Sequence, residues 1–144
     1  MTRSRQRGTL VLAIVFALAG CGPDRITAPA VSDAVAAVFG RLALLQQQIV
    51  GRGNAAPVDV RAACGRGAPS AGGAGAGDDW ACELSWTPAG SARMQSRYDV
   101  RLRPDGCFTA EGPPSAVGAT VLLSRDGQMV VNPLTAFDGC LDVA

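Results

Sequence analysis

The sequence predicts an α+β domain, in which an N-terminal amphipathic helix packs on an antiparallel β-sheet of four to five strands held by two disulfides. Three observations support this class. Apolar residues recur at steps of three or four over residues 31–50, later segments alternate apolar and polar residues, and four of the five cysteines lie beyond residue 63. Helices grouped on one face of an antiparallel sheet define an α+β fold.

The helix is expected over residues 31–50. Ser32 or Asp33 can cap its N-terminus, and Gly51 and Gly53 follow its end. A core helix on a sheet is the simplest interpretation, and a helix that docks a partner or the membrane surface is the alternative. Its polar face is not basic, which disfavours the membrane. The residues expected on its apolar face are Val35, Val38, Phe39, Leu42, Leu45 and Ile49.

The segment between the helix and the first long strand contains two features. Val58 and Val60 alternate with charged residues, which allows a short strand. Residues 65–77 are rich in glycine and alanine and predict a flexible loop. A phosphate-binding role for this loop is disfavoured, because the chain contains no lysine and the loop lacks the spacing of such a motif.

Alternation predicts the strands of the sheet. Residues 80–86 and 98–102 each place apolar residues at every second position. The turn at 103–106 predicts a hairpin that leads into a strand at 107–111. Further along, Arg125-Asp126-Gly127 predicts a second hairpin between residues 119–124 and 128–131, and a final short segment covers residues 137–143.

The cysteines of the domain predict two disulfides, because four cysteines outside the cytoplasm commonly pair. Three pairings exist, and Cys64–Cys82 with Cys107–Cys140 is favoured because each joins neighbouring segments. The first of these would close the 65–77 loop at its base. A zinc site built from all four thiolates is the alternative, but no two cysteines have the C-x-x-C spacing.

The N-terminal residues carry the features of a secretory signal. Arginines within residues 3–7 precede an apolar run over residues 9–18, which is shorter than the about 20 residues that a membrane-spanning helix needs. The run ends in Leu18-Ala19-Gly20-Cys21, which resembles the lipobox of bacterial lipoproteins. The resemblance implies that residues 1–20 are a signal peptide, cut between Gly20 and Cys21, and that Cys21 carries fatty acyl chains such as palmitate.

Two other interpretations of this segment stay open: an ordinary signal peptide with an incidental cysteine, and an unlipidated membrane anchor. In the lipoprotein interpretation, residues 21–30 form a lipidated tether to a single domain of residues 31–144. Gly22, rather than an aspartate, follows the cysteine. The protein would therefore be expected, outside the cytoplasm, on the outer membrane of a two-membrane cell or on the cell membrane of a single-membrane cell.

Composition excludes several functions. Three of the 13 arginines precede Cys21, so ten remain against 12 acidic residues and the formal charge of the processed chain is about −2. A nucleic-acid-binding domain usually has a marked basic excess. The chain contains no histidine, which excludes a Ser-His-Asp triad, a Cys-His dyad and every histidine-ligated metal site. No catalytic residue, metal or cofactor is therefore predicted.

The candidate contact residues lie on two strands. Arg97, Arg101 and Arg103 are expected to share the solvent face of one strand, either as a site for an anion or a partner or as an ordinary solvated face. Trp80 and Trp86 share the parity of the core positions, and Trp86 is the one expected to reach a surface edge.

The expected function is that of a non-enzymatic lipoprotein of the cell envelope, which displays a small disulfide-stapled domain to a protein or cell-wall partner. The alternative is a small-molecule or glycan binding module, which needs a concave apolar pocket. A hydrolase that uses acidic residues is a third interpretation. It would need two close carboxylates, and nothing in the sequence fixes the spacing between Asp78, Asp79 and Asp138.

Overall fold

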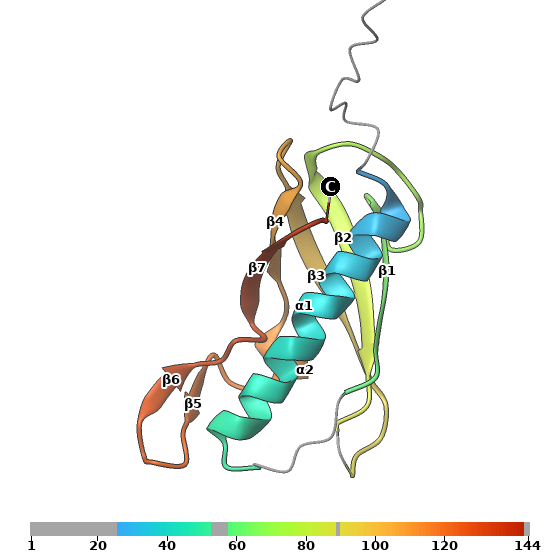
Figure 1. Cartoon of the computed structure of the whole chain (residues 1–144). Helices are drawn as coiled ribbons and strands as arrows, with labels where there is room; N and C mark the ends of the chain where they lie inside the picture. The colour runs from blue at the N-terminus through green and yellow to red at the C-terminus, as the bar shows by residue number, and fades with distance from the viewer. Residues whose placement is uncertain (1–25, 53–57, 89, 143–144) are drawn as a thin grey trace, which may run out of the picture.

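The computed structural model describes residues 26–52, 58–88 and 90–142. One long helix lies across one face of a five-stranded sheet, and a two-stranded hairpin projects beside the end of the helix (Figure 1). The fold is α+β, as predicted. In chain order the elements are α1 (Ala28–Ile49), β1 (Val60–Arg66), β2 (Gly77–Trp86), β3 (Met94–Leu102), β4 (Cys107–Glu111), α2 (Pro114–Val117), β5 (Val121–Leu123), β6 (Met129–Val131) and β7 (Ala136–Cys140).

The five-stranded sheet is antiparallel throughout, with strand order β1-β2-β3-β4-β7. The sequence predicts the second hairpin as a continuation of this meander, but among the described strands β5 and β6 pair only with each other. After β4, Pro113 cannot donate to a sheet ladder, and the short helix α2 carries the chain away from the sheet. The chain then returns as β7, which pairs with β4.

Helix α1 begins three residues earlier than the sequence predicts, and neither Ser32 nor Asp33 is its cap. The Oγ1 atom of Thr27 accepts a hydrogen bond from the Ala30 amide at 3.5 Å, and Pro29 occupies the first turn, where a missing N–H costs nothing. Residues 28–30, predicted as tether, are therefore helical. Ile26 also lies in the core, with 3% of its surface exposed.

The buried face of α1 follows steps of four residues. It consists of Val31, Val35, Phe39, Ala43 and Gln47. Val35 and Phe39 are confirmed on this face, whereas Leu45 is 44% exposed and does not belong to it. Each step of four residues advances about 40° around a helix of 3.6 residues per turn, so the observed face winds around α1. The predicted set mixed steps of three and four and stayed on one side, so Val38 and Leu42 are only partly buried against the core and Leu45 lies outside it. This buried face identifies α1 as a core helix, although its length and composition also suit a membrane span.

An aromatic cluster fills the space between α1 and the sheet. The ring centroid of Phe39 lies 4.9 Å from that of Trp86, 5.8 Å from that of Tyr98 and 6.1 Å from that of Phe137. These rings come from α1, β2, β3 and β7. A single helix residue therefore packs against three strands, which fixes the position of the helix on the sheet.

Both predicted disulfides form, and the zinc alternative is wrong. Cys64 and Cys82 face each other across β1 and β2 and lie on the buried side of the sheet. Cys107 and Cys140 face each other across β4 and β7, on the opposite side. The second bond ties the returning strand to the sheet.

Several hydrogen bonds connect the glycine-rich loop to its surroundings. Arg66, at the end of β1, donates hydrogen bonds from Nη1 to the carbonyls of Ala74 and Ala76 and from Nε and Nη2 to Asp79. The Ala28 amide also donates to the carbonyl of Gly73 at 3.1 Å. The Arg66 guanidinium thus supplies hydrogen-bond donors to backbone carbonyls of the loop. The Cys64–Cys82 bond closes the loop near its base, as predicted.

Candidate functional site

The three predicted contact arginines lie on the solvent-exposed face of the sheet. Arg97, Arg101 and Arg103 are all exposed, with Asp99 between the first two. The Nε atom of Arg97 lies 3.5 Å from Asp99, and Nη2 of Arg103 lies 3.1 Å from Asp105. In the described part of the chain, Arg101 makes no ion pair. Because such exposed pairs are well solvated, they contribute little to stability.

Trp86 does not reach a surface, which corrects its place among the contact residues. Only 3% of its surface is exposed, and its ring packs against Phe39. Trp80 is buried as predicted, with its indole N–H donating to the Gly75 carbonyl at 3.1 Å. Alternation correctly placed both side chains on the inner face. The expected exposure of Trp86 was wrong because α1 extends far enough to cover the end of β2.

A charged depression of about 500 Å³ lies on the exposed face of the sheet. The register places Arg101, Thr109 and Asp138 side by side on β3, β4 and β7. Asp78 and the Cys107–Cys140 bond complete its border. Charged groups of both signs surround the depression, so it differs from the apolar pockets that usually bind small molecules.

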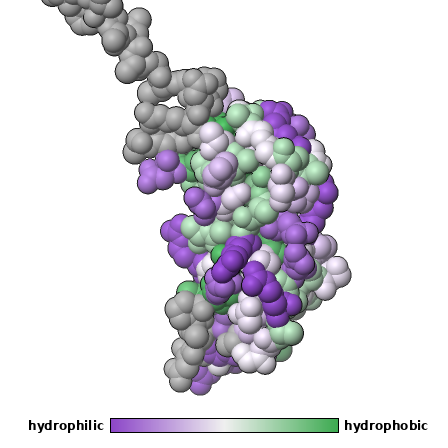
Figure 2. All heavy atoms as spheres, turned by 90° about the vertical axis from the view of Figure 1, so that its right-hand side faces the viewer, coloured by the Kyte–Doolittle hydropathy of each residue, from purple (hydrophilic) through white to green (hydrophobic). Residues whose placement is uncertain are grey.

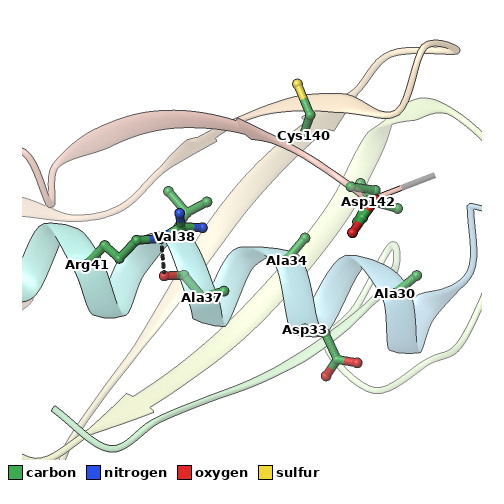
Figure 3. Close-up of a pocket in the computed structure, with 9 residues that line it drawn as sticks. Ala30, Asp33, Ala34, Ala37, Val38, Arg41, Cys140 and Asp142 are labelled. Carbon is green, nitrogen blue, oxygen red and sulfur yellow. Dashed lines mark hydrogen bonds between the residues drawn. The ribbon is translucent and has the colours of Figure 1, made fainter. Parts of the chain in front are cut away.

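Two shallower grooves run along α1. The groove between α1 and β7 has a volume of about 400 Å³, and the methyl groups of Ala30 and Ala34 point into it (Figure 3). Asp33 and Arg41 also line this groove, and Arg41 turns back to donate a hydrogen bond to the Ala37 carbonyl at 3.2 Å (Figure 3). The groove between α1 and β1 has about 310 Å³ and is lined mainly by small apolar residues. Neither groove gathers polar groups around a common point.

The hairpin β5–β6 carries an exposed apolar face. The register pairs Val121 with Val131 and Leu123 with Met129, so the four side chains lie on the same side of the hairpin. Their exposed fractions are 43% for Val121, 67% for Leu123, 77% for Met129 and 71% for Val131. On the opposite side, Leu122 and Val130 are only half-buried. These four exposed residues are called the hairpin patch below.

The hairpin patch is a candidate site that the sequence-based predictions do not include. The runs Val-Leu-Leu and Met-Val-Val are apolar at every position instead of alternating. An exposed hairpin has one polar face when it alternates, so an unbroken apolar run in a two-stranded hairpin leaves apolar side chains uncovered. On the β1 side of the molecule, by contrast, hydrophobic and hydrophilic residues are intermixed (Figure 2).

The carboxylates with resolved shifts are held in the charged form. Hydrogen bonds from the Arg66 guanidinium lower the pKa of Asp79, and a hydrogen bond from the Cys107 amide lowers the pKa of Asp105. A general acid needs the opposite shift. No three metal-ligating acidic, cysteine or histidine side chains gather anywhere in residues 26–52, 58–88 and 90–142.

The predicted cleavage and lipidation site, Gly20 and Cys21, lies outside the described residues, as do the signal segment 1–20 and residues 21–25 of the tether. The chain enters the described domain at Ile26, beside the N-terminal end of α1. Comparison of the chain with protein-family models, with curated proteins and with solved structures gave no match.

Proposed function

We propose that this protein is a non-enzymatic lipoprotein of the cell envelope, whose domain contacts a protein partner through the hairpin patch. The lipobox residues ending in Cys21 support the anchor, and the paired cysteines support a location outside the cytoplasm. The observation that carries the proposal is the hairpin patch itself. Its four side chains expose on the order of 400 Å² together, within the range of the largest apolar patches on monomers, which are often functional.

The position of the hairpin patch fits an anchored protein. The amide of Arg125, in the hairpin turn, donates to the carbonyl of Ile49 at the C-terminal end of α1. The chain enters at the other end of this 22-residue helix, which is about 33 Å long. A lipid at Cys21 would therefore hold the entry end near the membrane and present the hairpin patch to the envelope space.

The glycan or small-molecule alternative has weaker support. It relies on the charged depression beside Arg101, where acidic and basic groups face solvent and neither tryptophan is exposed. The hydrolase interpretation also lacks a suitable acid among Asp79 and Asp105, because their hydrogen bonds lower the pKa of each. The proposed contact function also explains the exposed hairpin patch, which the glycan and hydrolase interpretations leave unexplained.

The anchor is tested by intact mass and membrane fractionation of the native protein beside a Cys21→Ser variant. We expect the native protein to lose residues 1–20, to gain the mass of two or three acyl chains and to stay with the membrane. The Cys21→Ser variant should lose both the added mass and the membrane retention. A native protein released without lipid would overturn this part of the proposal.

The contact function is tested by photo-crosslinking from defined positions in cells. A photoreactive residue at Met129 samples the hairpin patch, and one at Gln95, which is also exposed but lies on the polar sheet face, is the matched control. We expect one major protein adduct from position 129, and we expect this adduct to be absent when the photoreactive residue is at position 95. The purified adduct protein should bind the wild type and bind a Met129→Lys variant at least about tenfold more weakly, because a charge enters an apolar contact. Equal binding would refute the contact role.

A further inference from the structure

The backbone of β6 has its free hydrogen-bonding groups on the same residues that carry the hairpin patch. The Asn132 amide donates to the Thr120 carbonyl at 2.8 Å, and the Ser124 amide donates to the Gln128 carbonyl at 2.8 Å. Hydrogen-bonded pairs alternate along an antiparallel ladder. The remaining bonded pair is therefore Leu122 with Val130.

It follows that Met129 and Val131 direct their N–H and C=O groups outward, along the open edge of β6. In the described part of the chain, neither residue makes a backbone hydrogen bond outside the hairpin. Their side chains are also the two most exposed of the hairpin patch. The outward-directed N–H and C=O groups and the most exposed apolar side chains therefore belong to the same two residues.

This edge lacks the features that normally prevent strand addition. Natural edge strands carry charged residues, proline or bulges that block pairing with another chain. The strands β5 and β6 contain none of these, and the nearest charges are Arg125 and Asp126 in the turn. A two-stranded hairpin is only marginally stable by itself, so a third strand would stabilise it.

We propose, building on the contact function above, that the hairpin binds an extended segment of a partner protein as a third strand along β6. Residues opposite each other on adjacent strands point to the same face, so the partner residues that pair with Met129 and Val131 lie on the hairpin patch. The bound segment is therefore uncharged, with apolar residues at every second position. Main-chain bonds supply affinity and the patch selects the side chains.

The area of the patch argues against a second copy of this chain as the occupant. A stable interface buries about 800 Å² on each partner, roughly twice what the four exposed side chains offer. A partner strand that adds main-chain hydrogen bonds needs less apolar area. The occupant is thus a strand from a different protein, and self-association and membrane binding become outcomes of the test.

The probe is a synthetic peptide in which valine and threonine alternate, with a lysine at each end for solubility. We expect it to bind the full-length protein and to slow hydrogen exchange at the amides of Met129 and Val131. The same peptide with N-methyl groups on one edge of its backbone keeps its side chains but cannot complete the ladder. It should bind more than about tenfold more weakly, because it loses every main-chain donor that would bond β6.

The matched protein variant is Val131→Pro, which removes one outward N–H but none of the bonds within the hairpin. We expect thermal unfolding close to that of the wild type and about fivefold weaker peptide binding, since one donor is lost. Loss of binding in Met129→Lys with full binding in Val131→Pro would overturn strand addition and leave the contact function intact. Failure of the peptide to bind, patch-dependent dimers in sedimentation, or patch-dependent binding to phospholipid vesicles would each overturn the strand proposal.

Discussion

The Nε2 atom of Gln46 in α1 donates a hydrogen bond to Oδ1 of Asn132, 2.9 Å away. Asn132 is fully buried, and its Oδ1 also accepts a bond from the Leu134 amide at 3.0 Å. Its Nδ2 donates to the carbonyls of Val117 and Ala119, each at 3.0 Å. One side chain therefore joins the core helix, the end of α2 and the segment between the hairpin and β7.

Replacement of this side chain should lower stability substantially. In Asn132→Ala the Ala119 carbonyl and the Leu134 amide lose these bonds, while the Val117 carbonyl keeps the bond from Gln46. Each buried polar group left unpaired costs about 1–3 kcal/mol. We expect the free energy of unfolding to fall by about 3 kcal/mol in total. Urea unfolding followed by circular dichroism measures it.

The control is Gln46→Ala, which removes only the bonds that Gln46 itself donates from a partly buried position. Its loss should be about 1 kcal/mol. If both variants lose the same free energy of unfolding, the hydrogen bonds of Asn132 to groups other than Gln46 do not contribute to stability.

Local periodicity explains why much of the fold could be predicted. The alternation around Cys82 and Tyr98 gave strands β2 and β3 and placed their side chains on the correct face. Because β1 and β2 are neighbours in both chain and space, the pairing of Cys64 with Cys82 followed from the same reasoning. Each of these features depends on residues close together in the sequence.

The remaining features depend on residues far apart. Asn132 and its partner Gln46 lie 86 positions apart, so no local pattern links them. The separation of β5 and β6 from the main sheet likewise reflects how α2 redirects the chain, which no local pattern shows. Periodicity therefore could not predict the hairpin patch, which is the strongest candidate site. The exposure of Arg101 was predicted correctly, because Arg101 lies on an alternating strand.

A methyl group at Gly112 should disrupt the core. A Cβ at this position would lie against the ring of Tyr98, closer than real carbon atoms approach each other. The ring cannot move freely, because its hydroxyl donates to the Leu134 carbonyl at 2.7 Å. We expect Gly112→Ala to lower the free energy of unfolding by about 2 kcal/mol or more, as overpacking does. Thermal unfolding measures the loss.

The matched control is Gly40→Ala in the middle of α1. A Cβ there would lie 3.6 Å from Val60, an ordinary contact. Alanine is favoured over glycine inside a helix by about 0.5–1 kcal/mol, so this variant should be slightly more stable than the wild type. Similar losses in both variants would show that close packing at Gly112 is not the cause.

The two disulfides should differ in their rate of reduction. Cys64 and Cys82 are at most 2% exposed, whereas Cys140 is exposed and Cys107 is half-buried. A reducing thiolate must reach a sulfur atom before exchange can occur. In native protein treated with dithiothreitol, we expect Cys107 and Cys140 to be alkylated first, as mass spectrometry of the peptides will show.

Unfolding supplies the control for this difference. In denaturant the packing that shields Cys64 and Cys82 is lost, so the two bonds should be reduced at similar rates. Equal rates in the native protein would mean that burial under α1 does not protect the first bond.

Tyr98 should give the protein a measurable sensitivity to alkaline pH. It is fully buried, and burial raises the pKa of its phenol above the ordinary value near 10. In the unfolded chain the phenol loses its proton near pH 10, while in the folded chain it stays protonated. Stability from this group is therefore complete below pH 10 and decreases as pH rises above it, by about 1.4 kcal/mol per pH unit.

The composition makes this prediction direct to measure. Tyr98 is the single tyrosine, so tyrosinate absorbance reports one residue. The chain has no lysine, the other side chain that titrates near pH 10. In an alkaline titration we expect tyrosinate to form only together with unfolding, seen by circular dichroism. Tyr98→Phe should be less stable at pH 7, because the Leu134 carbonyl loses its donor, but should show a weaker pH dependence above pH 10. Tyrosinate that forms near pH 10 in protein that is still folded would contradict the burial of this ring.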